Sequence, residues 1–253
     1  MAGVTRLDSL ELLLRADEPI GASAAERLRA VLERRLAHEP VARILGQSGF
    51  YGLDLAVTPD VLDPRADTET LVDAALLFLR ESKIERPRIL DLGVGSGAIL
   101  CALLSSAPDA LGFAVDVSEA ACRVAQANLD GCGLRERSAV LCGFWTDAIE
   151  GRFDLIVSNP PYIADEERAG LAPEVIRHDP PLALFGGKDG LDSYRRLAEN
   201  LGKFLNPGAQ AFLEIGWRQG ESVCFILRSA GFRDLSIVKD HGGRDRVVIA
   251  RQG

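Results

Sequence analysis

One segment constrains the fold of this 253-residue chain more than any other. Residues 89–97 read Ile-Leu-Asp-Leu-Gly-Val-Gly-Ser-Gly and continue into the apolar residues 98–104. This order predicts a buried strand, a glycine-rich turn and then a helix. From residue 88 onward, short apolar runs alternate with helical patterns, which indicates an α/β fold with a parallel sheet covered on both faces. The predicted strands lie near residues 88–92, 111–116, 138–142, 153–158 and 209–215.

The two ends of the chain depart from this alternation. Residues 233–239 and 245–251 flank a short glycine-containing turn, which predicts an antiparallel hairpin at the edge of a mostly parallel sheet. Residues 1–40 are expected to form a small N-terminal helical domain that either only packs or docks a substrate. Its leucines fall at helical spacing at the following positions: Leu7, Leu10, Leu13 and Leu14.

Three local signals place further boundaries. The sequence from Ser23 to Glu26 matches a capping box at the start of a helix. Glycines punctuate a predicted hairpin linker over residues 41–66. Residues 67–253 are expected to form the main domain, beginning with a helix that Thr68 caps and that runs to about Leu79.

The glycine turn predicts a ligand site. Glycine permits a tight turn and lets a ligand approach the backbone closely. The spacing is Gly-x-Gly-x-Gly and no Gly-Lys-Ser/Thr follows, so a phosphate-cradling loop is disfavoured. The residues expected to bind a cofactor here are Gly93, Val94, Gly95, Ser96 and Gly97.

Asp116 and Phe144 follow the second and third predicted strands. An acid in the place of Asp116 can accept hydrogen bonds from a ribose diol. It could instead cap the next helix, but Ser118 can serve as that cap. Phe144 could pack on adenine or could be a core ring. Ligands of open parallel sheets bind beyond the carboxyl ends of the strands, so these residues should converge at one edge.

Asn159-Pro160-Pro161-Tyr162 directly follows the apolar run of residues 153–158. The Asn159 side chain offers a carbonyl acceptor and an NH2 donor, and Pro160 offers a backbone carbonyl at a fixed φ. Tyr162 supplies a flat ring. Two acceptors beside a ring suit a planar NH2 group, either a carboxamide or the exocyclic amine of a base. The alternative is a plain turn, because Asn-Pro and Pro-Pro are common loop formers.

The composition narrows the class of protein. The net charge of −8 disfavours a general nucleic-acid binder and leans toward a protein substrate. No apolar stretch has membrane-spanning length and the first residues show no signal-peptide pattern, so we expect a cytoplasmic protein. The five cysteines have no paired spacing and are expected to fill the core in a reducing compartment. The three histidines are isolated, so no metal site is predicted.

Together these motifs resemble the S-adenosylmethionine-dependent methyltransferases that carry Asn-Pro-Pro-Tyr. Further segments resemble the peptide chain release factor glutamine methyltransferases, the HemK-type family, and the similarity runs from about Glu39 to Arg251. These segments are residues 39–46, 50–53, 61–69, 184–195 and 243–248. The sister family that methylates a ribosomal-protein glutamine usually lacks the Pro-Arg-x-x-Thr-Glu pattern. The resemblance implies a class I methyltransferase Rossmann-like sheet, S-adenosylmethionine as cofactor and peptide chain release factors as partners.

The resemblance also implies how the site works. Asn159 and the Pro160 carbonyl accept the two N–H groups of a glutamine amide, in the Gly-Gly-Gln motif of the factor. Tyr162 stacks beside the acceptor, Pro161 belongs to the same substrate site, and Asn159 also borders the cofactor. Catalysis then rests on orientation and electrostatics with no dedicated base.

Other family positions surround the cofactor. Phe144 takes the place of the aromatic that packs on adenine. Gly143 replaces an acidic neighbour and Val94 replaces a frequent threonine. Pro64, Arg65 and Glu69 are expected to shape the cofactor mouth, although Arg65 could equally form an ordinary ion pair.

Two other classes of enzyme share parts of this pattern. A nucleic-acid amino methyltransferase would use the same acceptor clamp, residues Asn159 to Tyr162, on a flipped base. A nicotinamide-dependent oxidoreductase is disfavoured by the Gly-x-Gly-x-Gly spacing and by the lack of an obvious hydride-transfer acid.

Overall fold

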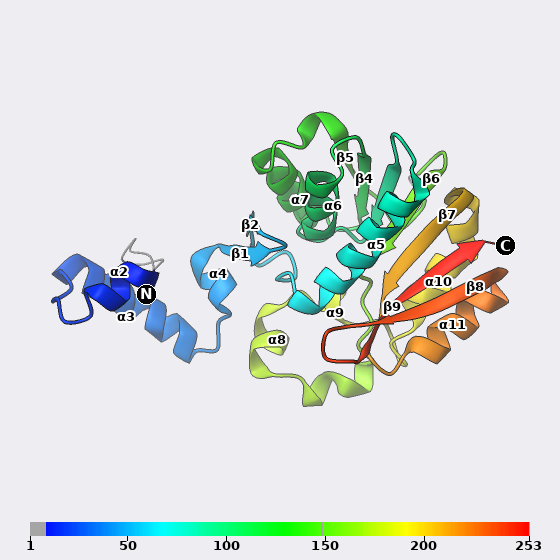
Figure 1. Cartoon of the computed structure of the whole chain (residues 1–253). Helices are drawn as coiled ribbons and strands as arrows, with labels where there is room; N and C mark the ends of the chain where they lie inside the picture. The colour runs from blue at the N-terminus through cyan, green and yellow to red at the C-terminus, as the bar shows by residue number, and fades with distance from the viewer. Residues whose placement is uncertain (1–8, 148, 253) are drawn as a thin grey trace.

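The computed structural model describes residues 9–147 and 149–252, and its centre is a seven-stranded sheet (Figure 1). The strand order is β5-β4-β3-β6-β7-β9-β8. The first five strands in this order run parallel, whereas β9 is antiparallel to both β7 and β8. This confirms the predicted mostly parallel sheet with an antiparallel hairpin at its edge. The strand bounds are β3 Arg88–Leu92, β4 Leu111–Asp116, β5 Ser138–Cys142, β6 Phe153–Ser158, β7 Leu205–Glu214, β8 Phe232–Lys239 and β9 Asp245–Gln252.

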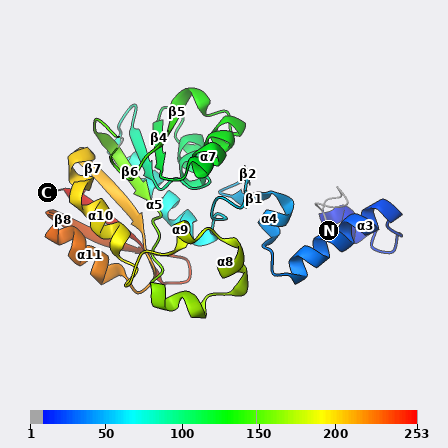
Figure 2. The ribbon, with the colours of Figure 1, turned by 180° about the vertical axis from the view of Figure 1, so that it is seen from behind.

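Helices cover both faces of the sheet, as its largely buried central strands require. One face carries α5 (Glu69–Ser82), α6 (Ala98–Ser106) and α7 (Glu119–Gly131). The other face carries α10 (Asp192–Asn200) and α11 (Gly220–Ser229), which come to the front in the reverse view (Figure 2). Alternate strand residues feed the two cores: Ile89 packs on the first face and Leu90 on the second.

The N-terminal part consists of helices followed by a small hairpin. Helices α2 and α3 project away from the sheet domain in both views (Figures 1 and 2). The bounds are α2 Ser9–Leu14, α3 Ala22–Leu36, α4 Val41–Leu45, β1 Gln47–Phe50 and β2 Leu53–Ala56. Leu10, Leu13 and Leu14 of α2 are exposed, and Leu7 lies outside the described residues. None of the helices in the described part of the chain has the length and apolar content that a bilayer crossing requires.

Short helical segments complete the fold. They are η1 Ala66–Thr68, η2 Arg135–Arg137, η3 Asp165–Gly170, α8 Pro173–His178, α9 Pro181–Leu184 and η4 Leu201–Phe204. Asn128 of α7 fixes the β1–β2 hairpin against the sheet domain: its Oδ1 accepts from the Ala56 N–H at 2.7 Å, and its Nδ2 donates to the Ser96 carbonyl at 2.8 Å. The hairpin is therefore tied to the glycine turn.

Three local expectations have clear outcomes. Ser118 caps α7 as expected, accepting from the Ala121 N–H at 3.2 Å. The capping box is wrong, because α3 begins at Ala22 with Gly21 as N-cap, two residues earlier than expected, and Ser23 instead accepts from Arg27 at 2.9 Å. The core-filling role is wrong for Cys142, which is exposed because it ends the edge strand β5.

Candidate functional site

The glycine turn after β3 holds a conformation that only glycine adopts readily. Gly93, Gly95 and Gly97 have φ angles of 77°, 53° and 80°. A Cβ on Gly97 would lie 3.1 Å from the Ala125 Cα, so this glycine lets α6 pack closely against α7. A Cβ on Gly95 would meet nothing within 4 Å, which leaves this part of the backbone open to a ligand.

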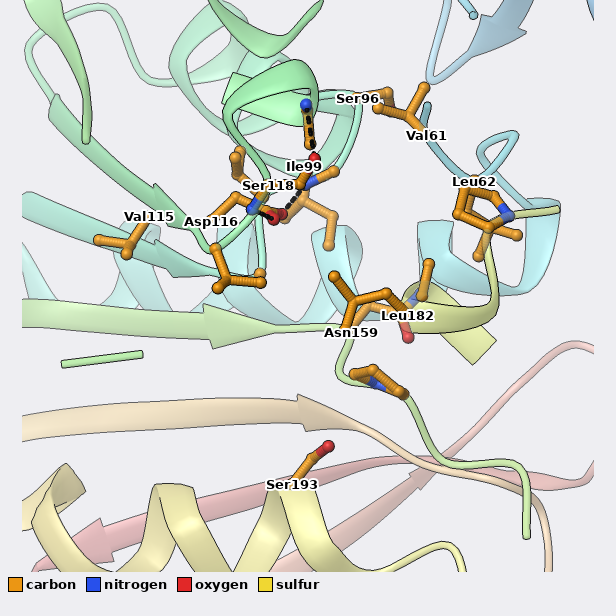
Figure 3. Close-up of a pocket in the computed structure, with 18 of the residues that line it drawn as sticks. Val61, Leu62, Ser96, Ile99, Val115, Asp116, Ser118, Asn159, Leu182 and Ser193 are labelled. Carbon is orange, nitrogen blue, oxygen red and sulfur yellow. Dashed lines mark hydrogen bonds between the residues drawn. The ribbon is translucent and has the colours of Figure 1, made fainter. Parts of the chain in front are cut away.

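Asp116 organises the turn from the neighbouring strand (Figure 3). Its Oδ2 accepts from the Gly95 N–H at 2.9 Å, and its Oδ1 accepts from the Ser118 N–H at 2.9 Å. The cap of α7 is the Ser118 side chain. A carboxylate has about four acceptor positions, so Asp116 keeps lone pairs for a ligand beyond these two bonds.

A cavity of about 490 Å³ lies at the carboxyl ends of β3, β4 and β6. Asp116 and Asn159 face it from two of these strand ends (Figure 3). The sequence-predicted residues that line it are Gly93, Val94, Gly95, Ser96, Asp116, Phe144, Asn159 and Pro161. Gly97, Pro160 and Tyr162 are not among the described residues that line it. The structure therefore brings most of the predicted site together in one place.

Two aromatic rings form one wall of the cavity. Phe144 is 49% exposed, so its ring is not part of the core. The Arg196 guanidinium of α10 lies 5.6 Å from the centre of this ring, and Trp145 meets it edge-on at 6.3 Å. The lining residues Trp145 and Arg196 carried no signal in the sequence, because their neighbours in the cavity come from distant segments.

Asn159 is held from the side by Thr68. Its Nδ2 donates to the Thr68 Oγ1 at 3.3 Å, across a separation of 91 residues. Thr68 makes no side-chain cap to α5, so the predicted capping role is wrong although the helix begins where expected. The Thr68 hydroxyl is committed to the site instead.

The rest of the Asn-Pro-Pro-Tyr segment is fixed by a glycine-rich loop and by Gln219. The Tyr162 carbonyl accepts from the Gln219 Nε2 at 2.9 Å. A Cβ on Gly186 would lie 2.5 Å from the Pro161 carbonyl oxygen, so only glycine fits there. Burial raises the pKa of Tyr162 to about 12, which keeps its phenol neutral at physiological pH.

The mouth of the cavity contains a partly buried ion cluster. Asp179 accepts from Arg43 at 3.1 Å and from Arg65 at 2.8 Å, and the Asp179 side chain is 1% exposed. Arg65 lines the cavity and forms an ion pair, so both expectations for it hold. Glu69 is not among the described lining residues; its Oε1 accepts from the Tyr51 N–H at 2.9 Å and fixes the hairpin turn. The role of Glu69 at the mouth therefore stays a prediction.

The cavity has an acidic character. Its lining includes the carboxyl groups Asp60, Asp63, Asp116 and Asp192 and the guanidinium groups Arg65 and Arg196. Asp91, buried beneath the turn, has its pKa raised to about 7 by burial and by the nearby charge of Asp116. The described residues contain no cluster of side chains suited to a metal ion. The arrangement suits a flat, hydroxyl-bearing ligand with a positively charged group.

The fold and the cavity define a class I methyltransferase. Residues 68–185 match the family model of the methyltransferase small domain, and residues 1–46 match that of the PrmC N-terminal domain. The solved catalytic domain of hMettl16, in complex with an RNA hairpin of the MAT2A 3′UTR, has the same fold. The TM-score is 0.64 at 16% identity, over 80% of this chain and 76% of that one.

Two relatives give the family. A release factor glutamine methyltransferase of Rhodospirillum rubrum is 46% identical over 241 residues, covering 95% of this chain and 73% of the relative. A release factor glutamine methyltransferase of Agrobacterium fabrum is 44% identical over 254 residues, covering 100% of this chain and 88% of the relative. The chain belongs to the release factor glutamine methyltransferase family.

Proposed function

We propose that this chain transfers a methyl group from S-adenosylmethionine to the side-chain amide nitrogen of glutamine in the Gly-Gly-Gln motif of peptide chain release factors. The observation that carries the acceptor chemistry is the Asn159 amide, which faces the cavity with its nitrogen engaged by Thr68. Its oxygen is thereby left to accept an N–H group from a substrate. The names of the relatives support the choice of substrate.

The cavity fits the proposed cofactor. Asp116 would accept from the ribose hydroxyls, and the half-exposed Phe144 ring would pack on adenine. The open backbone at Gly95 and the acidic lining would hold the methionine part with its positive charges. When bound, the cofactor supplies an electrophilic methyl group on a sulfonium. The residues proposed to bind it are Gly93, Val94, Gly95, Ser96, Gly97, Asp116, Phe144 and Asn159.

The chain's own residues address the harder partner, because an amide nitrogen shares its lone pair with the carbonyl. The Asn159 Oδ1 and the Pro160 carbonyl would accept the two N–H groups and fix the orientation of the nitrogen. Both acceptors also favour the positive charge that develops there. Pro161 borders this acceptor position, and the neutral Tyr162 ring would stack beside it. No general base is required, because the remaining proton can leave to solvent.

The partner is proposed to be the intact release factor, with the enzyme acting in the cytoplasm and with no membrane or direct nucleic-acid binding. The net charge of −8 supports a protein substrate over nucleic acid. We expect intact factor to be a better substrate than a short tip peptide, because remote contacts help to orient the amide.

The test is labelled-methyl transfer to wild-type release factor and to its Gln→Ala variant, run beside ribosomal protein, RNA and DNA. We expect label only in the wild-type factor, with mass spectrometry locating one methyl group on the glutamine. Equal labelling of the variant would contradict the proposed acceptor. Preferential labelling of RNA or DNA would point to an amino methyltransferase of nucleic acid instead.

A further inference from the structure

The strand register places one buried acid beside the catalytic asparagine. Strands β6 and β7 are parallel and pair Ser158 with Leu213. The next residues, Asn159 and Glu214, therefore end neighbouring strands at the cavity edge. Glu214 is 1% exposed and does not line the cavity among the described residues, so it lies behind the asparagine and not in front of it.

Polar groups connect Glu214 to Asn159. The Asn159 Nδ2 donates to the Thr68 Oγ1 at 3.3 Å. The Glu214 carboxyl lies near the Thr68 hydroxyl and the Asn159 side chain, and both lower its pKa. Its Oε2 has no hydrogen-bond partner in the described part of the chain. Thr68 is itself 4% exposed, and its hydroxyl is placed to interact with both the Asn159 amide and the Glu214 carboxyl.

The protonation state of the Glu214 carboxyl determines which way the Asn159 amide faces. An ionised carboxylate only accepts, so it draws the Thr68 hydroxyl proton toward itself. The threonine oxygen then presents a lone pair to Asn159, which matches the amide NH2 and not the amide oxygen. A flipped Asn159 would place its NH2 against the N–H groups of the acceptor amide, where no hydrogen bond forms.

We propose that Thr68 and Glu214 are positioning residues for methyl transfer, holding the Asn159 amide with its oxygen toward the acceptor nitrogen. This inference rests on the proposed function. It extends that function to Thr68, at the cavity wall, and to Glu214, which is not among the described lining residues; both act through Asn159.

The burial and charges around Glu214 predict how kcat should depend on pH. Burial raises the pKa of Glu214 to about 7, while the nearby Thr68 and Asn159 side chains and the charge of Arg246 oppose this rise. The other titratable groups facing it are Asp67, Tyr162 and Tyr194, and the Tyr194 hydroxyl donates to the Glu214 carbonyl at 2.8 Å. Below this pKa the carboxyl can donate as well as accept, so it no longer fixes the direction of the Thr68 hydroxyl. The orienting effect is then weakened, so kcat should rise as pH increases through about 7.

The test uses isosteric variants in the full chain with release factor as acceptor. Thr68→Val should lower kcat by about 2- to 10-fold, and Glu214→Gln by about 10- to 150-fold, the ranges for one neutral and one charged hydrogen bond. The Kd of S-adenosylmethionine, measured by calorimetry, should change much less. Thr68→Ser keeps the hydroxyl and should restore most of the activity. Thr70→Val is the matched control, because it removes a hydroxyl from a buried threonine of α5 that does not line the described cavity.

Two readouts separate positioning from a merely structural role. The rise of kcat near pH 7 should disappear in Glu214→Gln. In single-turnover assays, adding Thr68→Val to Asn159→Ala should cause no further loss, because the threonine acts through the asparagine. Multiplied losses in the double variant, an unchanged pH profile in Glu214→Gln, or full activity of Thr68→Val would each overturn the proposal. If the wild-type chain does not methylate release factor at all, the proposed function itself fails.

Discussion

Removing the Asp116 carboxylate should weaken cofactor binding and also loosen the glycine turn. Each charged hydrogen bond to a ribose hydroxyl contributes about 1.5–3 kcal/mol, so Asp116→Ala should raise the Kd of S-adenosylmethionine by about 10- to 150-fold. The same change leaves the Gly95 and Ser118 N–H groups without their acceptors at 2.9 Å. Because the site is open to water, we expect these two losses to lower the free energy of unfolding by about 2–4 kcal/mol.

Asp154 offers a matched control for that structural loss. Its Oδ2 accepts from the Arg88 N–H at 2.8 Å and its Oδ1 accepts from Asn206 at 2.7 Å, at the opposite end of the same sheet. Asp154→Ala should therefore lower the melting temperature by a similar amount and leave the Kd of the cofactor unchanged. The assay is calorimetric titration, at one salt concentration and well below both melting temperatures.

A ligand that lacks the ribose hydroxyls tests the same contact from the other side. A cofactor analogue without the ribose hydroxyls should bind the wild-type chain about 10- to 150-fold more weakly than the cofactor itself. Asp116→Ala should bind the analogue and the cofactor with nearly equal affinity, because the interaction is already lost. If a folded Asp116→Ala variant still prefers the hydroxyl-bearing ligand by the wild-type factor, Asp116 does not bind the ribose.

Three further predictions concern the clamp, the buried acid under the turn and the ion cluster. Asn159→Ala should lower kcat by about 10²–10³-fold and change the cofactor Kd much less; near-wild-type turnover would make the residue structural. Asp91→Asn should raise the melting temperature most at pH 8, less at pH 5 and least near pH 3, because the raised pKa makes Asp91 destabilise the fold progressively as pH rises from the pKa of the unfolded chain to about 7; a pH-independent difference would refute this. Asp179→Asn should lower the free energy of unfolding by about 3–5 kcal/mol by leaving Arg43 buried without its charge partner, whereas Arg65→Met should cost at most about 1 kcal/mol; equal costs in chemical denaturation would contradict the burial argument.

The sheet could be predicted from the sequence because its signals are local. Strands buried on both faces are short apolar runs, and the glycine turn marks where the first of them ends. The convergence of Asp116 and Asn159 then follows from topology alone, since the carboxyl ends of parallel strands share one edge.

The walls of the cavity could not be predicted in this way. Trp145 and Arg196 meet at Phe144 although they come from a loop and from α10, about fifty residues apart. In the sequence, Gly186 is marked only by the family resemblance. The structure shows why a glycine is needed there: the Pro161 carbonyl oxygen leaves no room for a side chain. Such contacts between distant segments leave no period or spacing in the sequence.

Thr68 shows why a correct local rule can give the wrong role. A threonine directly before a helix is a good cap, and α5 begins at Glu69. The hydroxyl nevertheless accepts from the Asn159 amide, because an unpaired polar group buried at a site costs more than an unmade cap at a helix end that other groups can serve. Its neighbour Glu69 bonds the hairpin at Tyr51. The two adjacent residues of the Pro-Arg-x-x-Thr-Glu pattern thus serve two different contacts, one with the clamp and one with the linker. The pattern therefore joins the segment before the sheet domain to Asn159.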